Sequence, residues 1–293
     1  MDRYNQVLKE SKVPVDKEEI KQALDKIYEK IPALRNTEVY TKIFNCIDLT
    51  TLNTTDSQQS VAGFIQRVND FDNEYPQYPN VAAVCVFSNF AGVVKSTLEV
   101  TGVNTAVVAG GFPSGQTFTE VKVADVALAV AEGADEVDVV MNLGMLRDHN
   151  YEELCDELIE VKHAAKEAHM KVIIESGALR EPEQIRDASI LAMYSDADFI
   201  KTSTGKVYEG ASPEAAYVMC QCIKEYHEKT GRKVGFKAAG GVRSADDALV
   251  YYAIVKEVLG EEWLNNSLFR IGASSLANAI LAKMIDEAEV KYF

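Results

Sequence analysis

The sequence predicts an α/β fold of the (β/α)8, or TIM-barrel, class with an extra N-terminal helical segment. Short runs rich in Val, Ile and Ala alternate with longer segments whose apolar residues recur at helical spacing. Eight such units over about 250 residues match the count and length of this barrel. Several of the runs are apolar throughout, as expected for parallel strands that are covered on both faces.

The eight strands are predicted from the apolar runs in chain order. They cover residues 43–49, 81–87, 104–110, 136–142, 171–176, 198–203, 233–239 and 269–274. An open doubly wound sheet uses the same alternation and is the main alternative, but no GxGxxG motif follows the first run. No low-complexity linker divides the chain. We therefore expect one catalytic barrel domain at residues 41–293, and a helical extension at residues 1–40 that covers the barrel's bottom or contacts another subunit.

Helices between the runs are predicted by their end signals. Ser212 can cap a helix whose first residue is Pro213, and Gly231 follows its last turn. Ser244 and Asp247 form a capping-box pattern ahead of the next helix. These signals fall where a barrel needs its outer helices.

Composition narrows the class of protein. The formal net charge is -15, from 45 acidic and 30 basic residues, which disfavours binding to nucleic acid or to an anionic membrane surface. No apolar run approaches the roughly 20 residues that cross a bilayer. The first residues are polar, so we expect no secretion signal. The five cysteines follow no paired metal or disulfide pattern. We expect reduced thiols in the cytoplasm.

Four charged residues are predicted at or near strand ends, where barrel enzymes hold their active sites: Asp48, Asp138, Lys201 and Lys237. A purely structural ion pair is one interpretation. However, Lys201 and Lys237 end adjacent strands about 4.8 Å apart. Repulsion and burial should make one of them lose its proton readily, and a neutral amine can attack a carbonyl to form an imine. The lysine pair therefore suggests a nucleophile and its activator.

Aspartates on the neighbouring strands complete this candidate site. Asp138 lies between Val137 and Val139, so we expect it to point into the barrel, where it can move protons. Asp48 is a similar but less decisive candidate. Glu136 lies nearer the strand entrance, and we expect it to be solvated or to pack against the preceding turn.

Three glycine-containing turns predict a phosphate site. Glycines let backbone N–H groups approach an anion, and a helix N-terminus favours negative charge. Barrels commonly bind phosphate at the loops after strands seven and eight. The candidate residues are Thr204, Gly205, Lys206, Gly240, Gly241, Gly272, Ser274 and Ser275. No HxH, HExxH or carboxylate-rich loop suggests a metal site.

Six segments, in order, make the chain similar to a known family: IDLTTL, AAVCVF, EVDVV, FIKTSTGK, GFKAAGGVR and RIGASS. From about Thr41 to about Lys283 the chain resembles the deoxyribose-phosphate aldolase family. The combination of FIKTSTGK with GFKAAGG is the most specific part. Ala238 departs from the proline that usually follows the family's second lysine.

The resemblance implies reversible cleavage of 2-deoxy-D-ribose 5-phosphate to D-glyceraldehyde 3-phosphate and acetaldehyde, with no metal or organic cofactor. Lys201 is similar to the Schiff-base lysine and Lys237 to the lysine that perturbs its pKa. Asp138 corresponds to the acid/base aspartate, with Asp48 in support. Tyr292 is a possible acid/base in the tail, although the residues around it do not match.

Two alternatives remain open at this point. One is another Schiff-base sugar-phosphate aldolase, such as a transaldolase-like enzyme. The other is a non-catalytic barrel that binds a phosphorylated metabolite. In each case the expected partner is a small phosphorylated sugar or aldehyde, and we expect a homo-oligomer, a dimer or a tetramer.

Overall fold

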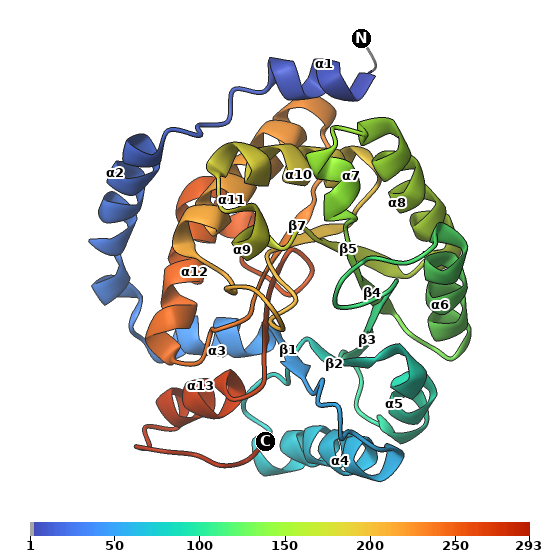
Figure 1. Ribbon diagram of the computed structural model, residues 1–293. Coiled ribbons are helices and arrows are strands. Elements are labelled where there is room, and N and C mark those ends of the chain that lie inside the picture. The colour runs from blue at the N-terminus through green and yellow to red at the C-terminus, as the bar shows by residue number, and fades with distance from the viewer. Residues whose placement is uncertain (1–2) are drawn as a thin grey trace.

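The computed structural model describes residues 3–293 and contains a closed barrel of eight parallel strands in the order β1 to β8 (Figure 1). The (β/α)8 prediction is confirmed. The strands are β1 Ile47–Thr50, β2 Ala83–Phe87, β3 Asn104–Ala109, β4 Glu136–Val140, β5 His169–Ile173, β6 Phe199–Lys201, β7 Gly235–Ala239 and β8 Phe269–Ala273.

Helices connect successive strands and cover the outside of the barrel (Figure 1). The α-helices between and after the strands are α4 Gln58–Glu74, α5 Ala91–Thr97, α6 Thr119–Ala131, α7 Leu143–Arg147, α8 Tyr151–Ala165, α9 Ser176–Leu179, α10 Pro182–Tyr194, α11 Pro213–Thr230, α12 Ala245–Leu259 and α13 Leu276–Met284. The short 3-10 helices among them are η2 Ser88–Phe90 and η3 Glu261–Trp263. The predicted caps are confirmed, because Ser212 accepts a hydrogen bond at the start of α11 and Ser244 forms a capping box at the start of α12.

The N-terminal segment consists of α1 Arg3–Glu10, α2 Lys17–Tyr28, η1 Ile31–Leu34 and α3 Thr37–Asn45. Helix α2 lies against α11 and α12 on the outside of the barrel, with Ile20, Leu24 and Ile27 buried (Figure 1). Within residues 3–293, no helix combines the length and apolarity needed to cross a membrane.

The first strand begins later than the sequence suggested. Asn36 caps α3, and this helix continues through Ile43 and Phe44, both fully buried. These apolar residues belong to the buried face of an amphipathic helix and were wrongly assigned to the strand. Cys46 ends the helix, so β1 spans residues 47–50 instead of 43–49.

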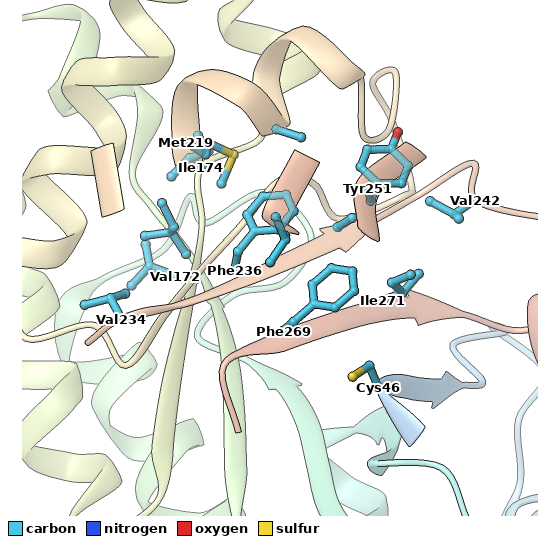
Figure 2. Close-up of a cluster of buried hydrophobic side chains, with 14 of the residues drawn as sticks. Cys46, Val172, Ile174, Met219, Val234, Phe236, Val242, Tyr251, Phe269 and Ile271 are labelled. Atoms are coloured by element: carbon cyan, nitrogen blue, oxygen red, sulfur yellow. The ribbon is translucent and has the colours of Figure 1, made fainter. Parts of the chain in front are cut away.

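Alternation along the strands separates an apolar outer face from an inner face that carries the charged side chains. Figure 2 shows Phe236 of β7 and Phe269 of β8 in an apolar cluster, together with Met219 of α11 and Tyr251 of α12. The two phenylalanine rings stack with centroids 6.4 Å apart. Since neighbouring side chains point to opposite faces, the residues that follow these phenylalanines, Lys237 and Arg270, point into the barrel.

Candidate active site

The barrel interior holds a layer of buried charges contributed by six of the eight strands. Each charged residue alternates with apolar residues that pack against the outer helices, which fixes the direction of its side chain. Every member is at most 3% exposed. The set consists of Asp48, Glu136, Asp138, Lys171, Lys201, Lys237 and Arg270.

Asp138 is the centre of this network. Its Oδ2 atom accepts hydrogen bonds from Lys201 Nζ and from Lys237 Nζ, both at 2.7 Å. Its Oδ1 atom accepts a hydrogen bond from Lys171 Nζ at 2.9 Å. The two predicted lysines pair directly between β6 and β7. Their nitrogens share one oxygen, so they are no more than two hydrogen-bond lengths apart, and the predicted proximity is confirmed.

A second group of charges lies beside Asp138. Arg270 donates to Asp48 Oδ1 at 2.6 Å and to Glu136 Oε1 at 2.7 Å. Lys171 also donates to Glu136, and Lys237 to Asp48. The expectation that Glu136 is solvated is wrong: it is fully buried and faces inward with Asp138, two residues further along β4.

Sequence reasoning missed Lys171 and Arg270. A signal for both was present, because each is a lone cation inside an apolar strand run. Alternation would have placed Arg270 on the inner face, opposite Phe269 and Ile271. The partners could not be identified in the same way, because they depend on the register between strands, such as Asp138 beside Lys171 and Lys237 beside Arg270.

The carboxylates of the network are held in their charged form. Burial opposes the charge of Asp138, but Lys171, Lys201 and Lys237 outweigh burial and keep its pKa well below the ordinary value. Burial likewise opposes the charge of Asp48, and the cations Lys237 and Arg270 overcome it, so the pKa of Asp48 is also lowered. Both aspartates therefore remain negative near neutral pH.

The two lysines differ in their tendency to keep a proton. Burial lowers the pKa of Lys201; Asp138 opposes this effect, and the ammonium of Lys237 adds to the lowering. Burial also acts against the charge of Lys237, but Asp138 and Asp48 together reverse the effect and raise the pKa of Lys237. The cause is geometric: Lys201 forms a salt bridge with one carboxylate and Lys237 with two.

A pocket of about 300 Å³ lies at the carboxyl ends of the strands. Of the four charged residues predicted at the strand ends, Lys201 lines this pocket, whereas Asp48, Asp138 and Lys237 lie in the network beneath it. The pocket also brings together all the predicted phosphate residues: Thr204, Gly205, Lys206, Gly240, Gly241, Gly272, Ser274 and Ser275. Arg243, which was not predicted, lines it as well.

The backbone around this pocket is closely packed. Gly205 and Gly240 both have positive φ, 72° and 82°. A Cβ atom on Gly240 would lie 3.1 Å from the Cα atom of Gly205 and 2.9 Å from that of Gly210, so a side chain would force these loops apart. Ser275 precedes the N-terminus of α13, where the helix dipole favours an anion.

Tyr292 is not brought to this pocket. Its hydroxyl donates to the backbone carbonyl of Arg67, and its ring packs edge-on against Phe71 of α4 and against Tyr75, which follows this helix. Its backbone N–H is bonded to Asn278 of α13. The tail is thus anchored between α4 and α13. Among residues 3–293 no cluster of three or more His, Cys, Asp or Glu residues is suited to hold a metal ion.

A closed parallel barrel with a lysine-lined pocket at the carboxyl ends of its strands has the architecture of a (β/α)8-barrel enzyme. A family model described as "DeoC/LacD family aldolase" matches residues 42–280. The chain therefore belongs to the DeoC/LacD family of aldolases, which are carbon–carbon lyases.

Individual relatives agree with this family. The chain is 43% identical over 270 residues to a putative deoxyribose-phosphate aldolase of Caenorhabditis elegans, covering 91% of this chain and 88% of the relative. It is 38% identical to the human deoxyribose-phosphate aldolase, covering 86% and 82%. A solved structure of a putative deoxyribose-phosphate aldolase from Coccidioides immitis matches with a TM-score of 0.69 at 26% identity, covering 91% of this chain and 98% of that one.

Proposed function

We propose that the protein is a deoxyribose-phosphate aldolase that reversibly cleaves 2-deoxy-D-ribose 5-phosphate to D-glyceraldehyde 3-phosphate and acetaldehyde through a Schiff base on Lys201. The observation that carries the proposal is the asymmetry of the lysine pair. Lys201 lines the pocket and has one carboxylate partner, whereas Lys237 lies beneath and has two. Lys201 is therefore the amine that gives up its proton more readily.

In the synthetic direction, the neutral Nζ atom of Lys201 attacks the carbonyl carbon of acetaldehyde, and the adduct loses water to give an imine. Removal of a proton from the adjacent carbon gives an enamine. Its carbon attacks the aldehyde carbon of glyceraldehyde 3-phosphate, and hydrolysis then releases the product and Lys201. Asp138, whose Oδ2 atom accepts a hydrogen bond from Lys201 Nζ, passes protons on during these steps. Asp48 supports Lys237 through their hydrogen bond.

The phosphate of the sugar would bind in the same pocket. Lys206, the turn at Gly205, the Gly240–Gly241 pair and the start of α13 supply positive charge and backbone N–H groups. Lys206 Nζ, which now donates to the carbonyl of Leu52, would reach a phosphate by changing partner. Proteins of this class described as deoxyribose-phosphate aldolases align over most of the chain, which supports this substrate.

We further propose that residues 41–293 form the catalytic domain and residues 1–40 a helical extension, and that the protein is a cytoplasmic homo-oligomer, a dimer or a tetramer. All five cysteines are buried free thiols, which supports a reducing compartment. The exposed apolar side chains Phe118, Val121 and Leu128 offer a surface for self-association.

Borohydride trapping tests the covalent step. Sodium borohydride should reduce the imine formed with acetaldehyde and so leave one ethyl group on the wild-type chain. Peptide mapping should locate this group on Lys201. The Lys201→Ala variant should remain unlabelled, with Lys206→Ala as a control that removes a neighbouring amine and keeps labelling. Absence of label in the wild type, or label that survives in Lys201→Ala, contradicts the proposal. Turnover of dihydroxyacetone donors in place of acetaldehyde would indicate a transaldolase-like enzyme.

A further inference from the structure

Glu175 occupies an unusual position between β5 and α9. Its backbone adopts φ 51° and ψ 59°, a left-handed conformation that residues with a Cβ atom rarely use. Its side chain is buried, with the residue only 3% exposed. It is not among the residues that line the substrate pocket. A buried carboxylate on a strained backbone indicates that the side chain has a specific task there.

The carboxylate holds one residue of the phosphate pocket from outside. Glu175 Oε1 accepts a hydrogen bond from the backbone N–H of Thr204 at 3.1 Å, and Oε2 accepts one from the Thr204 hydroxyl at 2.6 Å. Both carboxylate oxygens of Glu175 are thus used by the same residue. The neighbouring Ser176 N–H donates to the carbonyl of Thr202 at 2.8 Å, which ties the same two strand ends together.

The two hydrogen bonds between Thr204 and Glu175 fix the turn that follows β6. Because the hydroxyl hydrogen of Thr204 points to Glu175, its oxygen is free to accept the backbone N–H of Lys206, at 3.2 Å. Gly205, between them, packs on Gly240 of the loop after β7. The contacts therefore run from the end of β5, through the turn after β6, to the loop after β7.

We infer that Glu175 is a positioning residue for the substrate phosphate, because it holds Thr204 and so keeps the Thr204–Lys206 turn against the glycine loop after β7. It acts through Thr204 and touches neither the reacting carbon atoms nor the phosphate. This inference rests on the proposed function. It predicts a defect confined to the phosphorylated substrate, since acetaldehyde needs Lys201 but not the phosphate loop.

The test compares KM with kcat in the intact protein. Glu175→Ala should raise KM for 2-deoxy-D-ribose 5-phosphate about tenfold, which corresponds to about 1.4 kcal/mol, with kcat changed less than about twofold. The rate of borohydride trapping with acetaldehyde alone should equal that of the wild type. Glu175→Gln keeps the size of the side chain and one acceptor oxygen, so it should raise KM about threefold. This second variant gives the same test if the first does not fold.

A matched control is available in the same region. Glu209→Gln removes a carboxylate from the exposed part of the loop after β6 and should leave KM unchanged. A wild-type chain that fails to cleave the sugar phosphate refutes the proposed function itself. Two results would overturn the positioning role alone, given an active wild type. One is an unchanged KM in the Glu175 variants. The other is a raised KM together with a lowered kcat and a loss of acetaldehyde trapping.

Discussion

Replacing Lys237 with leucine separates an electrostatic role of this residue from a direct chemical one. The Nζ atoms of Lys201 and Lys237 both bond to Asp138 Oδ2 at 2.7 Å, so they are at most 5.4 Å apart. At an effective dielectric constant of about 20, two unit charges at this distance repel by about 3 kcal/mol, or about two pKa units. The neighbouring carboxylates offset part of this repulsion.

The expected result follows from the sign of this repulsion. Lys237 lowers the pKa of Lys201, so its loss raises that pKa and leaves a smaller neutral fraction near neutral pH. If neutral Lys201 is the nucleophile, kcat/KM near neutral pH should fall about 10- to 100-fold. The rate should recover at higher pH, where Lys201 again loses its proton. The rising limb of the pH–rate profile should therefore move up by about one to two units.

The assay is the cleavage of 2-deoxy-D-ribose 5-phosphate, followed through glyceraldehyde 3-phosphate from about pH 6 to about pH 10. Lys233→Leu serves as the control, because Lys233 is an exposed lysine just before β7 that pairs with Glu262. It should leave the profile unchanged. A Lys237→Leu profile that is low at every pH, with an unmoved limb, would show that Lys237 itself transfers a proton. Wild-type rates in Lys237→Leu near neutral pH would refute any role of Lys237 in the reaction.

Two further predictions concern the stability that the buried charges provide. Arg270→Met removes the guanidinium that joins Asp48 to Glu136, so the free energy of unfolding in urea should fall by about 3–5 kcal/mol. The surface variant Arg232→Met should lose at most about 1 kcal/mol. Because the folded-state pKa values of Asp48, Glu136 and Asp138 are lowered, their contribution should be complete above the ordinary carboxyl pKa of about 4 and decline as the pH falls below it. Unfolding free energies that stay constant from about pH 6 to about pH 3 would contradict this assignment.

The sequence was sufficient for the barrel, because the fold depends on local signals that recur. Each strand is a short apolar run and each outer helix has a recognisable start, as at Ser212 and Ser244. The failure at Ile43 and Phe44 has a physical cause. A short apolar segment can be the buried face of a helix or a strand, and tertiary packing decides between them.

The charge network was only half predictable for a different reason. Alternation tells which side chains enter the barrel, and it applies to Lys171 and Arg270 as well as to Lys237. Which charges meet depends on register and closure, such as β8 lying beside β1 so that Arg270 reaches Asp48. The hydrogen bonds from Thr204 to Glu175 could not be predicted either, because no sequence pattern indicates a glutamate with a left-handed backbone.

The charges inside the barrel explain why one lysine in particular should become neutral. With every group charged, four cations face three carboxylates: Lys171, Lys201, Lys237 and Arg270 against Asp48, Glu136 and Asp138. A buried excess charge is costly, and loss of one proton balances the set. Arg270 cannot lose a proton, and Lys171 and Lys237 each contact at least two carboxylates. Lys201 has one carboxylate partner and opens to the pocket, so the network itself favours the neutral amine at the position where the substrate carbonyl would arrive.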